Sequence, residues 1–448
     1  MPAKVETSPT LPGLSPVCGR RIEARFDGTH LSSDGGLLVL REVEQRLGLA
    51  RRLAGCIVDP RAPERVLHGM DEIIRFRMLM IAAGYEDGND ADALRADPMF
   101  KLAMERLPDQ ADLCSQSTIS RTENLPNLHA LRRMGHAMVD QYCASFVQVP
   151  RRIVLDVDDT FDAVHGGQQL RLFNAYYDEY GFQPIVVFDG DGRMIAAVLR
   201  PACRPTGRQI VKWLRRLIAA LRANWPRVQI MLRADSHYCT PEVLRFCRAE
   251  RLDYTLGLAT TTRLRKHILA LEASTLARAN AVGGGKLRRF KEFYDGARSW
   301  DRVERIIARV EAGPRGTDTR FVVTSLAPLS GRTIYQDIYC ARGQAENHIK
   351  AWKTHLAADR TSCGRATANQ MRLFLHIGAY WLMWNLRTLM PRRSRWRVAQ
   401  FDTLRLRLIK IAVRIEVLRT QVRLHLPKAT PDQAIFTLLL TRMPRLSL

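Results

Sequence analysis

The chain has 448 residues, too many for one small hydrophobic core, so its length predicts two or three domains. A hydrophobic content of 46% excludes a disordered chain. Its 69 Lys and Arg residues against 45 Asp and Glu residues give a net charge of +24, which favours a polyanionic partner. Nucleic acid is the leading candidate, because basic surfaces gain affinity when phosphates release their counterions.

An anionic membrane also attracts basic proteins, but we expect no membrane association. The N-terminal stretch MPAKVETSPTLPGLSP has no apolar run of the signal-peptide type. The most apolar later stretch, LFLHIGAYWLMWNL, is short and contains His376, which indicates a buried core helix.

The nine cysteines include no C-x-x-C pair, and their number is odd. This usage is typical of reduced thiols, so we expect a cytoplasmic protein. A zinc site made of His237, Cys239 and Cys247 is conceivable, but the spacing matches no common ligand pattern, and core or incidental cysteines are the better interpretation.

Residues 1–150 are predicted to form a mainly helical region after a short extended start. Runs such as LLVLREVEQRLGLARRLA and MDEIIRFRMLMIAAG are amphipathic with helical period, and no strand-rich block interrupts them. Near the end of this region, a helix start at Ser117 or Thr118, followed by Arg121 and a second helix after Pro126, resembles a DNA-reading helix. Arg121 is therefore a candidate DNA contact, although simple N-capping explains the hydroxyl residues equally well.

From residue 151 the pattern changes to alternating strands and helices. RRIVLDVDDT predicts an apolar strand ending in carboxylates, and QPIVVFDGDGRMIAAVLRP predicts two strands joined at a D-G-D-G turn. A helix in RQIVKWLRRLIAALRANW, a strand in VQIMLRAD, a helix opening at TPEVLRFCRAE and a strand in DYTLGLA follow. This succession is the order of a ribonuclease-H-like α/β core, whose first part we place at residues 151–260.

The rest of the chain divides into three predicted parts. Residues 261–335 contain a basic helix and probable strands in RRFKEFYDG, DRVERIIARVEA and TRFVVTSLA, which indicate a β-rich insertion. Residues 336–390 resume the helical pattern as the C-terminal part of the core, which carries Glu346. Residues 391–448 interleave Arg and Lys with Leu, Ile and Val, and we expect a basic helical tail.

Three carboxylates remote in sequence are expected to meet in such a core. Asp156 and Asp158 point to one face of the first strand and Asp159 to the other, because side chains alternate along a strand. Asp235 ends the fourth strand, which is the predicted neighbour of the first, and the helix bearing Glu346 packs alongside. Hard oxygen ligands of this kind hold Mg²⁺ or Mn²⁺, and two such ions can cut a phosphodiester.

Structural roles compete for the same acids. A carboxylate at a strand end often caps the next helix or pairs with an arginine, and Asp235 has Arg233 close by in sequence.

The segment DIYCARGQAENHIKAWKTH places one glutamate among cations and aromatic residues. In a regular helix, Tyr339, Arg342, Glu346 and Lys353 fall within roughly 60° of arc, so they share one face. Such a stripe suits phosphate binding next to a metal-binding acid. The alternative is a solvated helix face with charge pairs such as Glu346 with Lys350, which is itself a candidate DNA contact.

These four residues reproduce the Tyr-x2-Arg-x3-Glu-x6-Lys signature of DDE insertion-sequence transposases, which have ribonuclease-H-like cores. The stretches LDVDDTFDAVHGGQQ, LRADSHY, GLATTTRL and YCARGQAENHIKAWKTHLAADRTSC look like the corresponding blocks of one subgroup, the insertion-sequence family numbered thirteen-eighty. The likeness runs from about Arg20 to the C-terminus.

The resemblance implies that Asp158, Asp235 and Glu346 are the catalytic acids and bind two divalent ions. Asp158 is the choice for the first acid because in the family this acid commonly precedes one residue and then a threonine; Asp156 is the rival, or an outer ligand.

The resemblance also implies a set of DNA contacts and partners. Tyr339, Arg342 and Lys353 would hold phosphates at the transposon end, and the N-terminal region would help recognise terminal inverted repeats. The expected partners are double-stranded DNA, both terminal repeats and target, and a second copy of the chain when two ends are paired. The expected location is a bacterial cytoplasm, on the nucleoid when DNA is bound.

The implied activity is metal-dependent cleavage at transposon ends, followed by transfer of the 3′-hydroxyl to target DNA. Two alternatives share the pattern: a transposase-derived DNA-binding protein without activity, and a structure-selective nuclease on the same core.

Overall fold

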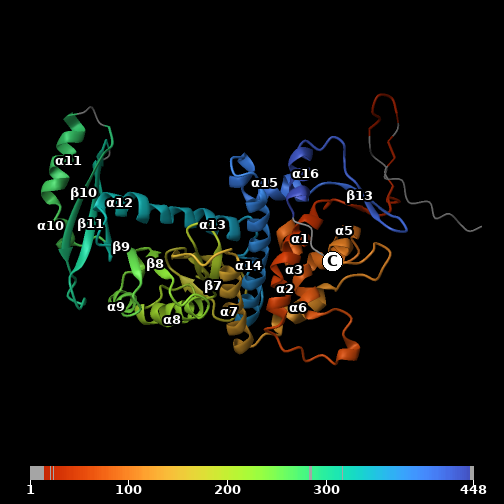
Figure 1. The fold of residues 1–448 in the computed structure, drawn as a ribbon, viewed down its shortest axis with the longest axis horizontal. Helices are drawn as coiled ribbons and strands as arrows, with labels where there is room; N and C mark the ends of the chain where they lie inside the picture. The colour runs from red at the N-terminus through yellow and green to blue at the C-terminus, as the bar shows by residue number, and fades with distance from the viewer. Residues whose placement is uncertain (1–14, 21, 24, 282–284, 315, 444–448) are drawn as a thin grey trace, which may run out of the picture.

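The computed structural model describes residues 15–20, 22–23, 25–281, 285–314 and 316–443. Most of the N-terminal stretch analysed for a signal sequence lies outside these residues. Figure 1 shows an elongated molecule, with the strands of residues 287–324 at one end and the helices of the first 150 residues toward the other. The remaining strands of the main sheet lie between them.

A mixed eight-stranded sheet organises the fold, in the order β10-β11-β12-β9-β8-β2-β6-β7. Its strands are β2 (Arg152–Asp159), β6 (Ile185–Phe188), β7 (Met194–Val198), β8 (Gln229–Ala234), β9 (Asp253–Leu258), β10 (Leu287–Asp295), β11 (Glu304–Gly313) and β12 (Gly316–Thr324). β6 runs antiparallel to β2 and to β7, whereas β8 is parallel to β2 and to β9. The predicted succession of these elements is therefore confirmed, as is the pairing of the first and fourth predicted strands.

Helices cover this sheet where the sequence predicts amphipathic runs. α8 (Gly207–Asn224) starts with a capping box at Thr206 and packs on α9 (Pro241–Ala249), whose first turn carries Pro241. The long α14 (Ala366–Leu389) packs against β7 and is buried nearly all round. The prediction that LFLHIGAYWLMWNL forms a buried core helix is thus confirmed.

A second sheet of very short strands follows β2, and the sequence did not reveal it. Its order is β3-β5-β4, with β3 at Asp162–Ala163, β4 at Leu172–Asn174 and β5 at Glu179–Phe182. Strands of two to four residues are too short to show a period-two pattern.

Residues 261–335 extend the main sheet. β12 pairs antiparallel with β9, β11 with β12, and β10 with β11. The helices α10 (Thr262–Lys266) and α11 (Leu269–Ala281) precede these strands, and α11 packs on β10 and β11. Helices and strands together occupy this stretch, and its boundaries as a separate unit stay a prediction.

One helical segment runs from the β10–β12 end of the molecule to α14 (Figure 1). It consists of α12 (Gly331–Thr333), a π-helical stretch η4 (Ile334–Tyr339), a 3-10 turn η5 (Cys340–Gly343) and α13 (Gln344–Lys353). The expectation of one regular helix is wrong from Asp337 to Gly343. A π-turn is wide and a 3-10 turn is narrow, so the angular positions of Tyr339 and Arg342 differ from those of an ideal helix.

The N-terminal region is mainly helical, as predicted. Its principal helices are α1 (Leu37–Leu47), α2 (Leu49–Ala54), α3 (Met70–Ala83), α5 (Pro98–Ala103), α6 (Gln116–Asn124) and α7 (Leu128–Ala144). α1, α3, α6 and α7 all pack against α14. A side-chain atom added at Gly378 of α14 would lie 2.2 Å from Met78 Sδ, so only glycine allows α3 to approach this closely.

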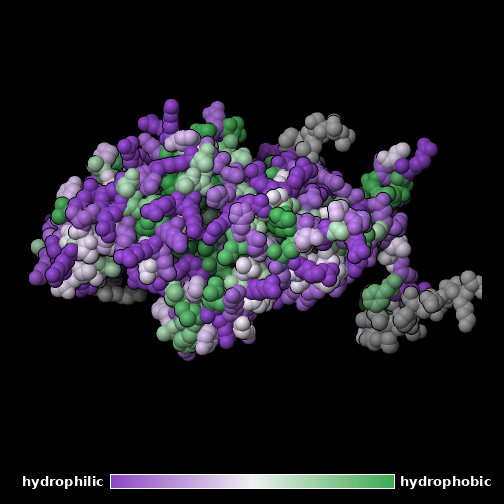
Figure 2. Space-filling view, turned by 90° about the horizontal axis from the view of Figure 1, so that it is seen from below, coloured by the Kyte–Doolittle hydropathy of each residue, from purple (hydrophilic) through white to green (hydrophobic). Residues whose placement is uncertain are grey.

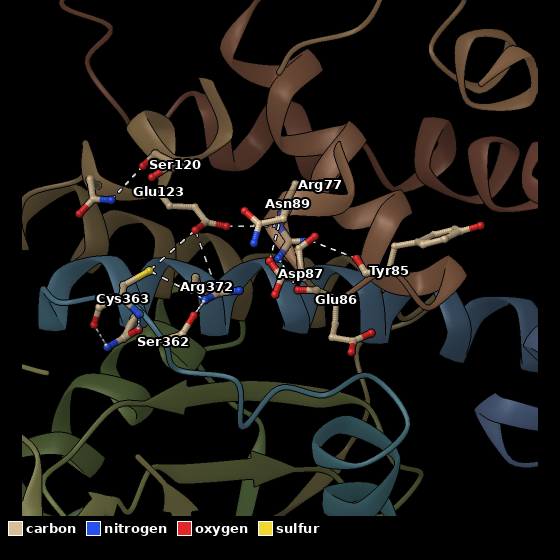
Figure 3. A network of polar contacts seen from close by, with 12 residues as sticks. Arg77, Tyr85, Glu86, Asp87, Asn89, Ser120, Glu123, Ser362, Cys363 and Arg372 are labelled. Atoms are coloured by element: carbon tan, nitrogen blue, oxygen red, sulfur yellow. Dashed lines mark hydrogen bonds and ion pairs between the residues drawn. The ribbon is translucent and has the colours of Figure 1, made fainter. Parts of the chain in front are cut away.

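A buried polar network joins these helices to the chain that follows α13 (Figure 3). Arg77 donates from α3 to Glu123 of α6 at 3.2 Å, and Arg372 of α14 lies 3.7 Å from the same carboxylate. Arg372 also donates to Ser362. One carboxylate thus holds two arginines from two helices, which fixes the N-terminal region on the core.

The C-terminal region corrects the expected helical tail. It contains α15 (Phe401–Leu404) and α16 (Gln433–Arg442), but also the hairpin β13 (Val413–Val417) and β14 (Val422–His425), which pairs with β1 (Leu31–Ser32). In VRIEV the β-branched residues alternate with charged ones, a period-two pattern that favours a strand.

The view in Figure 2 shows hydrophilic side chains over most of one face, with small hydrophobic patches between them. Among the described residues, no helix combines the length and the apolar character needed to cross a bilayer.

Candidate active site

The first two candidate acids lie on β2 but have different surroundings. Asp156 is 2% exposed, and Arg233, its partner in register on β8, donates Nε and Nη2 to its two oxygens at 2.6 Å each. A third donor of Arg233, Nη1, reaches the carbonyl of Ile338 at 2.7 Å. Both oxygens of Asp156 are therefore occupied, and the pair ties β2, β8 and the helical segment above them together.

Asp158 and Asp235 are brought together by a single guanidinium. Arg342 Nη1 donates to Asp158 Oδ2 at 2.8 Å, and Nη2 donates to Asp235 Oδ1 at 2.7 Å. Asp158 lies near the end of β2 and Asp235 directly follows β8, so the parallel pairing of these strands places the two acids at one edge. The interpretation that Asp235 pairs with Arg233 is wrong, because Arg233 is held by Asp156.

Asp158 and Asp235 repel each other, and Arg342 contacts both. Burial raises the pKa of Asp158 to about 6; Arg342 opposes this rise and Asp235 adds to it. Burial by itself would lower the pKa of Arg342, but Asp158 and Asp235 outweigh it and raise that pKa. Positive charge is needed between the acids, and Arg342 supplies it.

Tyr339 lies over the same edge. Burial raises its pKa to about 12, against the opposing effect of Arg342, so the phenol stays protonated. A side-chain atom added at Gly257 of β9 would lie 2.7 Å from the Tyr339 hydroxyl and 2.9 Å from the backbone nitrogen of Ser236. The absence of a side chain at Gly257 thus leaves the space that the Tyr339 hydroxyl occupies beside β9.

Glu346 lies on the same helical segment, one turn beyond Arg342, and its side chain is exposed. Within the described part of the chain it forms no ion pair, so the expected pairing with Lys350 is absent, and no group of three or more His, Cys, Asp or Glu side chains stands close enough together to hold a metal. The structure therefore brings Asp158 and Asp235 together and leaves Glu346 nearby but apart.

Lys353 ends α13 and contacts protein groups that follow β2. Its ammonium donates to the carbonyl of Phe161 and lies 3.5 Å from Asp162 Oδ1. Asp162 is 1% exposed, and burial raises its pKa to about 8, with Lys353 opposing the rise. Lys353 is thus anchored only a few residues beyond Asp158 in sequence.

The opposite face of β2 carries Asp159, as the alternation predicts. Its carboxylate is 3.1 Å from His237 Nε2 and accepts a hydrogen bond from Gln183. His237 is therefore not grouped with Cys239 and Cys247, and burial raises the pKa of each of these two thiols to about 12. Cys247 is buried and Cys239 is partly buried against the same core, and protonated thiols in such places fit the interpretation as core residues.

The two remaining candidate DNA contacts make no contact with Asp158 or Asp235 among the described residues. Arg121 is exposed on α6 and donates to Thr118 Oγ1 at 3.1 Å. The helix begins at Gln116, so Ser117 and Thr118 lie inside its first turn and are not its N-cap; the N-cap residue, Ser115, makes no side-chain capping bond. Lys350 is exposed on α13 and lines a polar cavity described below.

The family of the chain follows from a match to a family model. The family model described as "Transposase DDE domain group 1" matches residues 14–448, nearly the whole chain. The chain belongs to this DDE transposase family. No curated protein matches it.

Among solved structures, this transposase is similar to the "Cryo-EM structure of piggyBac transposase synaptic complex with hairpin DNA (SNHP)". The identity is 12% and the TM-score 0.41, over 84% of this chain and 80% of that one.

Three residues important to the site of this transposase escaped the sequence analysis. The sequence indicated Arg233 only as a partner for Asp235, and it indicated no role for Gly257 or Asp162. A charged residue in the middle of the apolar strand VQIMLRAD is a signal for a buried partner. Nothing local indicates the roles of Gly257 and Asp162, because their partners are 82 and 191 residues away (339 − 257 and 353 − 162).

Proposed function

We propose that this chain is an active DNA transposase with a ribonuclease-H-like core, of the insertion-sequence family numbered thirteen-eighty. It would cut phosphodiester bonds at transposon ends and transfer the resulting 3′-hydroxyl to target DNA. The observation that carries the proposal is the bridge of Arg342 between Asp158 and Asp235, since it shows two remote acids assembled at one sheet edge next to a cation of the signature.

The sheet supports the proposed core. β7, β6 and β2 form an antiparallel set, and β8 and β9 continue from β2 in parallel. The two acids come from the central neighbours β2 and β8. This is the strand order expected for a ribonuclease-H-like fold.

The donor set fits hard divalent cations. Carboxylate oxygens are the ligands that Mg²⁺ and Mn²⁺ prefer. Burial raises the pKa of Asp158 and Arg342 opposes that rise, so positive charge at this place stabilises the ionised acid. We propose Asp158, Asp235 and Glu346 as the ligands; Asp156, with both oxygens on Arg233, is better suited to positioning the strand. Two bound ions would activate the nucleophile and stabilise the leaving oxygen.

Arg342 would act as an exchangeable cation. In the structure described it satisfies both acids, and these contacts hold the acids in place. When a DNA phosphate approaches, the guanidinium can turn from carboxylate to phosphate, since both are bidentate acceptors that suit arginine. That movement frees Asp158 and Asp235, and Glu346, one turn along the helix, can then approach them.

Tyr339 and Lys353 would position the DNA end. The Tyr339 phenol stays protonated at neutral pH, so it can donate a hydrogen bond to a phosphate oxygen. No covalent link between protein and DNA is required, so Tyr339 has no nucleophilic role here. Lys353 would contribute an ammonium close to the Asp158 edge, where it is held through Asp162.

The partners follow from the same assignment. We propose that the N-terminal helices with Arg121 read the terminal inverted repeats, that Lys350 adds a phosphate contact, and that two copies of the chain pair two ends.

The test is a cleavage assay on donor DNA carrying the element's ends, with Mg²⁺ or Mn²⁺. Wild type should cut at the ends, and Asp235→Ala and Glu346→Ala should not. Cutting by either variant at the wild-type rate would contradict the mechanism. A strand-transfer assay with a pre-cut end separates a transposase from a nuclease, which would cut without joining. DNA binding without metal-dependent cutting by wild type would instead indicate an inactive derivative.

A further inference from the structure

A polar cavity of about 610 Å³ lies against α13. Gln344, Asn347, His348, Lys350 and Ala351 of this helix line it. At about 100° per residue, Gln344, His348 and Ala351 lie opposite to Glu346, whereas Asn347 lies at the side of the helix and Lys350 lies about 40° from Glu346. The remaining walls come from α14, from the turn between β6 and β7, and from residues 397–400.

Cations without carboxylate partners surround this cavity. Arg387, Arg397 and Lys350 line it, and within the described part of the chain none of the three forms an ion pair with Asp or Glu. Arg387 packs over the Phe401 ring at 5.0 Å, and Arg397 donates to the carbonyl of Arg387 at 3.4 Å. Each guanidinium has five donors, so these contacts do not use all of them.

The nearby acids are already occupied. Asp191, the one carboxylate in the lining, is 2.7 Å from Arg193, which also holds Asp189 at 2.9 Å. Asp402, beyond His355, is 3.1 Å from Arg405. The lining is therefore short of negative charge.

The crowding of cations affects the neighbouring groups. Burial lowers the pKa of Arg397, and Arg387, Arg392 and Arg193 lower it further. An anion in the cavity would relieve this repulsion.

We propose that this cavity binds a phosphodiester group of DNA, as a second DNA-backbone site separate from the Asp158–Asp235 edge. The inference rests on the proposed function. Two arginines, a lysine and the side-chain amides of Gln344 and Asn347 suit a singly charged, oxygen-rich group. Because Glu346 and five of the cavity-lining residues belong to the same helix, α13, phosphate bound here would also fix the helix that must bring Glu346 toward the acids.

The test compares DNA binding by wild type and by Arg387→Gln/Arg397→Gln, without divalent metal, by fluorescence anisotropy over a range of salt. Each lost phosphate contact reduces the magnitude of the slope of log K against log salt by about 0.9. We therefore expect the slope of the double variant to be smaller in magnitude by about one unit or more. The control is Arg208→Gln/Arg278→Gln, which removes two exposed charges elsewhere and should change the slope less. If the double variant does not fold, the single variant Arg397→Gln, which removes a repelled charge, replaces it in the same assay.

The outcomes separate the two proposals. Wild type that binds no DNA overturns both. Wild type that binds DNA with a slope unaltered by the cavity variants overturns the cavity site alone. A thermal shift with inorganic phosphate that the cavity variants abolish, with the DNA slope intact, would mean that the cavity takes free phosphate, and this too overturns the DNA site. A methylphosphonate removes the charge of a single DNA phosphate. At the DNA position that contacts the cavity, this substitution should weaken DNA binding by wild type. The same substitution should not weaken DNA binding by the cavity variant.

Discussion

Two arginine–carboxylate contacts lie side by side on β2, and they differ in how completely they are closed. In the first, the Asp156 and Arg233 side chains are 3% and 6% exposed, and both carboxylate oxygens are used. In the second, Arg342 is shared between Asp158 and Asp235, and the Asp235 side chain is 46% exposed. Two residues of strand separate a sealed contact from an open one.

The difference indicates what each contact is for. A sealed pair cannot release its carboxylate without leaving a buried charge unpaired, so it stabilises the sheet and holds the helical segment through Ile338. In the shared contact solvent reaches Asp235, so we expect this partner of Arg342 to take another cation at a lower cost than the buried Asp156 would. The buried Asp156–Arg233 pair therefore lies next to the more exposed contact of Arg342 with Asp158 and Asp235.

Asp235→Asn gives the largest expected effect. Cleavage should fall by more than about 100-fold, since loss even of an outer-shell partner costs 10–100-fold at a metal site. The free energy of unfolding should change by less than about 1 kcal/mol because the side chain is half exposed. Rates of end cleavage and urea unfolding measure the two quantities, and Asp253→Asn on β9 is the matched control. A large loss of stability with modest loss of rate would make the open contact a structural one.

Asp156→Asn should show the reverse pattern. Removing one partner of a buried pair costs about 3–5 kcal/mol, because Arg233 keeps its charge in the interior. Urea unfolding should show this loss, and the variant that stays folded should retain metal binding. If Asp156→Asn left stability unchanged but abolished metal binding, Asp156 would be the first metal-binding acid and the assignment to Asp158 would be wrong.

Gly257→Ala tests how the open contact is positioned. The added methyl group would be 2.7 Å from the Tyr339 hydroxyl, so the phenol must move. We expect a roughly tenfold loss of cleavage, in line with a supporting residue near a metal site. Tyr339→Phe removes the clashing oxygen, so adding Gly257→Ala to it should cost less than in wild type. Equal costs in both backgrounds would rule out an effect through Tyr339.

Asp162→Asn gives the smallest effect, in the pH dependence of stability. Burial raises the pKa of Asp162 to about 8, above its unfolded value, so the folded state holds the proton more tightly. Its stabilising contribution is complete below the unfolded pKa and is lost as pH rises through the folded one, a window of about pH 4 to 8. Unfolding free energies at pH 5 and 8 should therefore differ less in Asp162→Asn than in wild type. An identical pH dependence would contradict the burial of this acid.

The sequence predicted the main sheet well because its signals are local. The strand RRIVLDVDDT and the helix opening at TPEVLRFCRAE carry their periodicity and caps within a few residues. The signals for the short strands β3, β4 and β5 are not local, and neither is the π-turn before Arg342, which depends on packing against the sheet beneath it.

For the candidate site, the sequence indicated which residues to consider but not how they pair. It placed Asp156 and Asp158 on one face, and the structure does so. It could not show that Arg233 takes up Asp156 while Arg342 spans Asp158 and Asp235, because those choices depend on strand register and side-chain reach. The roles of the three catalytic acids stay a prediction.

The exchange of Arg342 for metal is the central claim, and Mn²⁺ binding without DNA tests it most directly. Electron paramagnetic resonance of free Mn²⁺ should show that Arg342→Gln binds the ion more tightly than wild type, by roughly fivefold or more, as expected for two cations competing for one pair of acids. Asp235→Asn should bind it more weakly. If Arg342→Gln binds Mn²⁺ no better than wild type, the guanidinium does not occupy the place of the metal and the account is contradicted.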